Sequence, residues 1–121
     1  MGKRIVVIED EPNIVEAIAF LLSREGWEVR TCGNGETALD TVRDLRPDAV
    51  LLDVMLPGRS GYEILKEMRA DPDLAALPVL MLTARGQKKD RDLADSLGVT
   101  RFMTKPFANA DLVAALAEIT T

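Results

Sequence analysis

The chain has 121 residues, of which 47% are hydrophobic and 29% charged, and its formal net charge is −5 at pH 7. This size and balance are typical of one globular domain with its own core, and they exclude a disordered chain and a basic nucleic-acid-binding surface. No apolar run is long enough to span a membrane, and the first residues lack the pattern of a signal peptide, so we expect a cytoplasmic protein that does not act on membranes or bind nucleic acid directly. Histidine is absent and Cys32 is the single cysteine, which leaves carboxylates, hydroxyls and lysines for chemistry.

Five apolar runs alternate with five longer segments of helical period. The predicted strands are residues 4–8, 27–32, 48–53, 78–83 and 101–104, and the predicted helices are about 12–25, 35–45, 60–70, 87–97 and 109–119. Asn34 and Ser60 stand where the second and third helices begin, and Gly26 and Gly98 stand where the first and fourth end. Strands that alternate with crossover helices form a parallel sheet covered on both faces, and the more polar second strand suits an edge.

Polar residues follow the predicted strands at one edge of that sheet. Glu9 and Asp10 follow the first strand, Asp53 ends the third, Thr83 ends the fourth and Lys105 follows the fifth. Ligands of open α/β sheets bind outside the carboxyl ends of the strands. Neighbouring carboxylates repel unless a cation lies between them, and an all-oxygen set without His or Cys suits Mg2+. The sequence therefore predicts a magnesium site at this edge.

These side chains are the equipment of a phosphoryl-transfer site. We predict that Asp53 is a nucleophile that forms an acyl phosphate, and that Lys105 and the Thr83 hydroxyl stabilise the transferring group. Asp10 is the predicted direct metal ligand, together with Asp53, with Glu9 directly or through water, and with the backbone carbonyl of Met55. 

The chain resembles the receiver domains of two-component response regulators, including the chemotaxis type. The resemblance runs over essentially the whole length through IVVIEDEP, VLLDVMLPGRSGYEIL, VLMLTARG and FMTKPF. It implies a flavodoxin-like, doubly wound five-stranded parallel sheet of order 2-1-3-4-5, with residues 1–121 forming a single receiver domain. It also implies transfer of a phosphoryl group from a histidine kinase or a histidine phosphotransfer protein to Asp53, slow self-catalysed dephosphorylation with no further enzymatic activity, and a cis peptide between Lys105 and Pro106.

The same resemblance implies a switch. It matches Thr83 and Phe102 to a pair in which the hydroxyl moves toward a phosphoryl oxygen and the ring turns into the vacated space. The switched surface would be formed by helix 87–97, strand 101–104 and helix 109–119. The downstream target is not specified, and the protein is expected to be a monomer or a phosphorylation-dependent dimer.

A docking surface for the kinase is predicted beside the acidic site. Ile14 and Ile18, four residues apart on the first helix, suit a helix-binding groove, although burial in the core explains them equally well. The resemblance adds Pro106 and Phe107 to the border of this surface.

Three alternative classes of protein share part of this chemistry or this fold. Met55 and Arg85 lie two residues beyond Asp53 and Thr83, where we expect them to flank the pocket mouth. A phosphatase of the haloacid dehalogenase type has a second Asp at the position of Met55. A flavodoxin-like mononucleotide binder needs a Gly, Ser or Thr loop where this chain has the three acids of residues 9–11. A constitutive binding scaffold with the same fold is the remaining alternative.

Overall fold

The computed structural model of the protein describes residues 2–84 and 86–121, so the predicted place of Arg85 falls outside the described residues. The strands are β1 (Arg4–Ile8), β2 (Glu28–Cys32), β3 (Ala49–Asp53), β4 (Val79–Thr83) and β5 (Arg101–Thr104). The helices are α1 (Pro12–Arg24), α2 (Gly35–Leu45), α3 (Gly61–Ala70), α4 (Lys88–Ser96) and α5 (Asn109–Ile119). Each predicted element is present, and the ends differ from the predicted ones by at most one residue.

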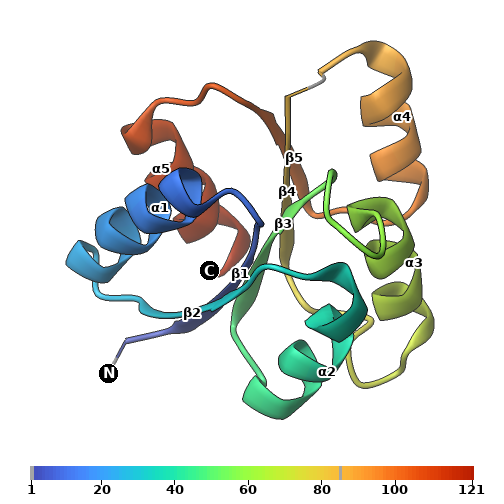
Figure 1. Ribbon diagram of the computed structural model, residues 1–121, viewed down its shortest axis with the longest axis horizontal. Helices are drawn as coiled ribbons and strands as arrows, with labels where there is room; N and C mark the ends of the chain where they lie inside the picture. Colours follow the sequence, from blue (N-terminus) through green and yellow to red (C-terminus); the bar gives the residue numbers. More distant parts are fainter. Residues whose placement is uncertain (1, 85) are drawn as a thin grey trace.

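The strands form one parallel sheet in the order β2-β1-β3-β4-β5. Helices α1 and α5 cover one face of the sheet, and α2, α3 and α4 cover the other (Figure 1). The predicted doubly wound, flavodoxin-like fold is therefore confirmed. Strands β3 and β4 are buried along their whole length, whereas β2 is exposed at three of its five residues and lies at an edge, as its polar sequence predicts. No helix in residues 2–84 and 86–121 is long and apolar enough to cross a membrane.

Local signals in the sequence set the helix ends. The Asn34 side chain accepts a hydrogen bond from the Glu36 N–H at 2.6 Å, and Ser60 Oγ accepts one from the Glu63 N–H at 3.2 Å. These two caps satisfy backbone donors that have no partner within the helix. Gly98, just beyond α4, has φ +88°, a left-handed conformation that glycine adopts without strain. The predicted caps are therefore confirmed.

Two apolar layers hold the sheet between the helices. Along β1, Ile5 and Val7 belong to the layer under α1 and α5, while Val6 and Ile8 belong to the layer under α2 and α3. This division follows from the strand geometry, in which successive side chains point to opposite faces. Because both faces are covered, the apolar strands satisfy the requirement that a parallel sheet be buried.

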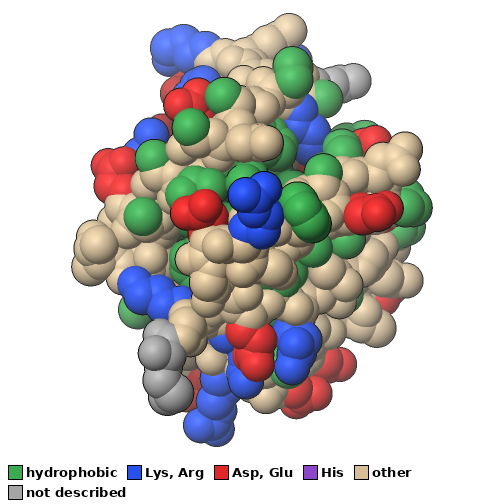
Figure 2. Space-filling model, turned by 90° about the vertical axis from the view of Figure 1, so that its left-hand side faces the viewer, with side chains coloured by type: hydrophobic (Ala, Val, Ile, Leu, Met, Phe, Trp, Pro, Cys, Tyr) green, Lys and Arg blue, Asp and Glu red, His purple; other side chains and the backbone are tan. Residues whose placement is uncertain are grey.

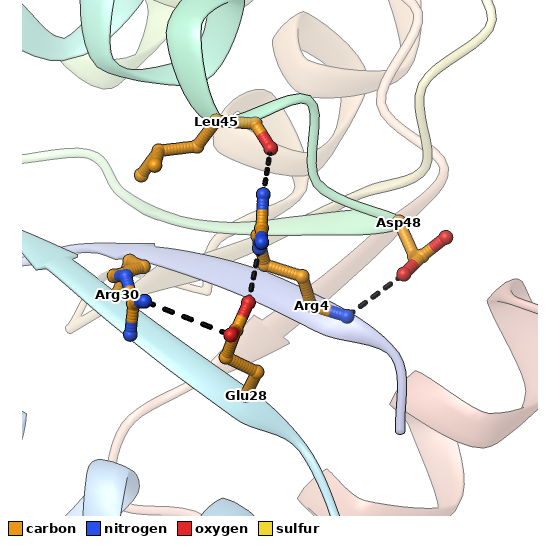
Figure 3. Close-up of polar contacts among 5 residues, drawn as sticks. All are labelled: Arg4, Glu28, Arg30, Leu45 and Asp48. Carbon is orange, nitrogen blue, oxygen red and sulfur yellow. Dashed lines mark hydrogen bonds and ion pairs between the residues drawn. The ribbon is translucent and has the colours of Figure 1, made fainter. Parts of the chain in front are cut away.

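Arg4 organises the end of the sheet that lies opposite the predicted site (Figure 3). Its backbone N–H donates to Asp48 Oδ2 at 2.7 Å, and its Nη1 donates to the Leu45 carbonyl at 2.5 Å. Its Nε also pairs with Glu28, which lies 3.6 Å from Arg30. These contacts join β1 to β2 and to the end of α2, and they help to fix the strand register at the amino ends of the strands.

Candidate functional site

The carboxyl ends of four adjacent strands bring the predicted site residues together. Asp53 and Thr83 are the last residues of β3 and β4. Glu9 is the first residue after β1, and Lys105 is the first residue after β5. Glu9, Asp53 and Thr83 are 2%, 4% and 2% exposed, and they are the buried polar side chains of the described chain. A parallel sheet this apolar buries such groups only where they serve each other or a ligand.

Backbone hydrogen bonds hold the ends of β3 and β5, and with them the predicted nucleophile Asp53 and Lys105, in place. The Gly61 N–H donates to the Val54 carbonyl at 2.8 Å, so α3 begins directly against the end of β3. The Lys105 N–H donates to the Thr83 carbonyl at 2.7 Å, which extends the pairing of β4 and β5 by one residue. The peptide between Lys105 and Pro106 is cis, as the resemblance implies.

Lys105 lies between two buried carboxylates. Its Nζ is 2.6 Å from Glu9 Oε1 and 3.3 Å from Asp53 Oδ1, and its side chain is 14% exposed. Glu11 Oε1 lies at 3.9 Å, and the other carboxylate oxygen of Glu9 accepts the Asp10 N–H at 3.0 Å. The lysine therefore makes its closest contact with Glu9 rather than with the predicted nucleophile.

The acids share their charge unequally. Burial, followed by the hydrogen bond and negative charge of Glu9, raises the pKa of Asp53 to about 7, against the smaller opposing effect of Lys105. Burial alone would raise the pKa of Glu9, but its hydrogen bonds to Lys105 and Asp53 and the lysine charge outweigh burial and lower it. Burial similarly opposes the charge of Lys105, yet Glu9 and Asp53 raise its pKa overall. Of the two buried acids, Asp53 therefore holds a proton to higher pH, and Glu9 ionises first and pairs with Lys105.

The acidic residues fit a divalent cation. Glu9, Asp10 and Asp53 each offer a carboxylate oxygen, and these atoms all lie within 4.8 Å of one another. Hard oxygen donors with two buried carboxylates and one exposed one suit Mg2+, which keeps several waters in its shell. Met55 lies two residues after the end of β3, and it is 68% exposed. The role of its backbone carbonyl as a metal ligand stays a prediction.

The two predicted switch residues lie on neighbouring strands. Thr83 is buried, and Phe102 is half-buried against the apolar layer under α3 and α4, opposite Met81 in the register of β4 and β5. The guanidinium carbon of Arg91 lies 5.2 Å from the centre of the Phe102 ring. The charged sequence around Arg91 in α4 gives no local signal of this contact, because its partner Phe102 lies on another element.

An apolar groove of about 500 Å³ opens beside the acidic site. The four predicted docking residues, Ile14, Ile18, Pro106 and Phe107, line this groove. The other residues of its lining are Asn13, Ala17, Ala84 and Lys105. Ile18 is 1% exposed and packs in the core, as one of its two interpretations predicted. Ile14 is only partly buried and is therefore the more accessible of the two. Figure 2 shows the side of the molecule formed by α1 and α5, where hydrophobic side chains lie at the surface among charged ones.

Comparisons with known proteins agree with this fold. The sequence profile of the response regulator receiver domain matches residues 5–117. A putative response regulator from Chloroflexus aurantiacus is 32% identical, with a TM-score of 0.94 over 99% of this chain and 98% of that one. The receiver domain of a sensor histidine kinase from Pseudomonas aeruginosa, described with a magnesium ion in its active site cleft, is 30% identical, with a TM-score of 0.91 over the whole of both chains. The chemotaxis protein CheY4 from Vibrio cholerae is 26% identical, with a TM-score of 0.92 over 98% of this chain and 99% of that one.

The profile covers most of the chain, and the fold is shared with the solved relatives. The chain therefore belongs to the response regulator receiver domain family. Receiver domains are modules of two-component signalling rather than enzymes that turn over an external substrate, which sets aside the phosphatase and mononucleotide-binding alternatives.

Proposed function

We propose that this receiver domain accepts a phosphoryl group on Asp53 from a phosphohistidine of a histidine kinase or a histidine phosphotransfer protein, in a step that depends on Mg2+. The observation that carries the proposal is the burial of Asp53 at a strand end, 3.3 Å from Lys105 and within an acidic cluster that suits a divalent cation. A buried carboxylate beside an ammonium is costly to maintain for stability alone, and such perturbed groups mark functional sites.

In the proposed reaction, a carboxylate oxygen of Asp53 attacks the phosphorus atom. The bond from phosphorus to the histidine nitrogen breaks, the nitrogen keeps the electron pair, and an acyl phosphate forms on Asp53. Attack requires the ionised carboxylate, so the raised pKa of Asp53 makes the reaction faster as the pH rises toward and above 7. Glu9, Asp10, Asp53 and the Met55 carbonyl would hold the Mg2+ ion, which when bound neutralises charge on the acids and on the phosphoryl oxygens.

Lys105 and Thr83 would stabilise the phosphoryl group after transfer. The Lys105 ammonium now bonds Glu9 at 2.6 Å, and a short rotation would bring it to a phosphoryl oxygen on Asp53. The Thr83 hydroxyl, at the end of the neighbouring strand, would donate to another oxygen and draw Phe102 into a new position. The exposed face of α4, β5 and α5 would then differ between the two states and present itself to a downstream target or to a second copy of the chain.

The groove beside the site would receive the phosphodonor protein. Ile14, Pro106 and Phe107 line it around the stem of Lys105, so a helix of the partner that binds there would bring a phosphohistidine close to Asp53. We expect phosphoryl transfer from a histidine kinase or a histidine phosphotransfer protein to take place in the cytoplasm, which is therefore the proposed location of this protein.

The test is phosphorylation by a small acyl phosphate with and without Mg2+, followed by intact mass measurement and mapping of the modified residue. We expect one phosphoryl group on Asp53 only when Mg2+ is present, and none on the Asp53→Asn variant. The matched control is Asp44→Asn, at an exposed position on α2, which should label like the wild type. Equal labelling of Asp53→Asn would disprove the nucleophile assignment, and multiple turnover on a phosphomonoester would restore the phosphatase alternative.

A further inference from the structure

Helix α4 is held only lightly by its own side chains. Ala94 is the one residue of the helix that is buried, and Leu93 is 43% exposed. At the first turn, Gln87 provides no side-chain cap, and Oδ2 of Asp90 is buried with no hydrogen-bond partner in the described part of the chain. The first turns of α4, before Ala94, therefore place no buried side chain in the apolar core.

The other end of α4 is tied down by Arg69 of α3. Nε of Arg69 donates to the Gly98 carbonyl at 2.7 Å, and Nη2 donates to Thr100 Oγ1 at 3.3 Å. Nη1 donates to three carbonyls of the loop before β4, the closest being that of Leu77 at 2.8 Å. One guanidinium thus joins the segment after α4 to α3 and to the loop before β4, and this end of the helix is the fixed one.

Arg91 connects the loosely held half of α4 to β5. Its guanidinium carbon lies 5.2 Å from the centre of the Phe102 ring, within the range of a cation–π interaction. The Arg91 side chain makes no ion pair or hydrogen bond among the described residues, so the ring is its specific partner. The contact exists only when the Phe102 ring and α4 both keep their present positions.

We propose that Arg91 is a positioning residue of the switch, and that its contact with Phe102 couples the position of the ring to the position of the first turns of α4. The inference rests on the proposed function, in which Phe102 moves when Asp53 is phosphorylated. When the Phe102 ring turns, its contact with the Arg91 guanidinium is broken or formed again. The change at β5 therefore affects the first turns of α4, while the end of the helix at Gly98 stays in place. By reciprocity, a partner that binds the face of α4 shifts the equilibrium of the ring.

The size of the effect follows from the exposure of Arg91. A cation–π contact at an exposed site changes the ratio of two states by about two- to fivefold, because it stabilises only the state in which the contact exists. Arg91→Gln should therefore shift the ratio of the two Phe102 positions by about this factor, toward the position without the contact.

The ratio is measurable by NMR on protein with ¹³C-labelled phenylalanine rings, in which Phe102→Leu assigns the resonance. The chemical shifts of the Phe102 ring without ligand and at saturating Mg2+ and beryllofluoride, a phosphoryl mimic, give the two reference positions of the ring. The shift of the ligand-free Arg91→Gln variant between these two values is compared with that of the wild type. Arg91→Lys keeps a cation and should show a smaller change. Lys89→Gln makes the same charge change at an exposed position of the same helix and should show none.

A double-mutant cycle closes the test. Arg91→Gln should change the apparent affinity for beryllofluoride in the wild-type background by about two- to fivefold, and this change should disappear when Phe102 is Leu. The inference is overturned if Arg91→Gln behaves like Lys89→Gln, or if its effect persists without the ring. Failure of this inference alone would leave Mg2+-dependent labelling of Asp53 and the movement of Phe102 intact, whereas loss of both of these would remove the proposed function as well.

Discussion

Lys105 is the residue on which the charges of the site depend. It neutralises one carboxylate through the 2.6 Å contact with Glu9 and lies 3.3 Å from the other, Asp53. Its stem also lines the apolar groove next to the site. A lysine in this position has two successive partners in the proposed reaction, first Glu9 and then the phosphoryl group.

Replacing Lys105 with Met should slow the phosphorylation of Asp53 by about a hundredfold, because it removes a charged donor aimed at the transferring group. Methionine retains the apolar stem, so the groove keeps its shape. The measurement is the initial rate of labelling by a small acyl phosphate at saturating Mg2+, with Lys66→Met, at an exposed position of α3, as the matched control. A rate close to that of the control would show that the ammonium has no part in transfer.

Asp53 should lower the stability of the metal-free protein at neutral pH. Its pKa is raised from 3.8 to about 7 by burial and by Glu9, so between these values the folded protein binds a proton that the unfolded chain has lost. The free energy of unfolding therefore falls as the pH rises through this range. Asp53→Asn cannot ionise and should be more stable than the wild type by about 1–3 kcal/mol above pH 7, with the difference vanishing toward pH 4.

Urea denaturation in the presence of a chelator, at several values of pH, measures this difference. The variant Asp44→Asn, which alters an exposed aspartate, should run parallel to the wild type. A gain for Asp53→Asn that is the same at pH 4 and pH 8 would contradict the ionisation argument and would point to packing instead.

At the scale of elements, the site depends on how closely α3 begins after β3. A Cβ added to Gly61 would lie 2.2 Å from the Asp53 carbonyl oxygen and 2.9 Å from the Val54 Cα. Both atoms are backbone, so neither can move aside without displacing the end of β3. The absence of a side chain at residue 61 thus allows the helix to start against the strand that carries Asp53, the proposed nucleophile.

Gly61→Ala should lower the free energy of unfolding by about 1–3 kcal/mol, the range of overpacking in a tight site, despite the better helix propensity of alanine. Gly33→Ala is the control, because a Cβ there would lie 3.7 Å from its nearest neighbour, an ordinary contact. Thermal and urea unfolding of both variants give the comparison. Equal stability of the two would show that the strand end yields more readily than its geometry indicates.

The element ends were predictable because their signals are local. Asn34 and Ser60 cap helices with their own side chains, and Gly26 and Gly98 have φ values of +94° and +88° just after helices end. The packing of α4 was not predictable in the same way. Its ties run through Arg69 and Arg91, whose partners lie on other elements, and no periodicity in the sequence records such contacts.

For the whole molecule, metal binding should appear as added stability. A ligand that binds only the folded state raises the free energy of unfolding, by about 1.4 kcal/mol at ten times its dissociation constant. Thermal unfolding at pH 7.5 should therefore shift to higher temperature as Mg2+ is added, and the shift should be smaller for Asp10→Asn, which lacks one of the three clustered carboxylates. The same shift in Asp10→Asn and wild type would show that Mg2+ acts elsewhere on this acidic protein.

The class of the fold and the sheet edge that gathers the predicted site residues follow from the order of residues along the chain. Apolar runs that alternate with helical periods require a parallel sheet covered by helices, and the carboxyl ends of parallel strands meet at one edge. The assignment of Asp53, Lys105, Thr83 and the acids after β1 to that edge follows from covalent order alone. The strand order came from the resemblance of four motifs rather than from periodicity, since several orders satisfy the same alternation.

Which of these groups touch depends on how the strands and helices pack together. Lys105 bonds Glu9, 96 positions away in the chain, more closely than Asp53, and this choice depends on the positions of β1, β3 and β5 within the sheet. Burial then raised the pKa of Asp53, and Ile18 became part of the core while Ile14 remained accessible. The contact of Arg91 with Phe102 arose in the same way, because distances between side chains on different elements are set by packing and not by position along the chain.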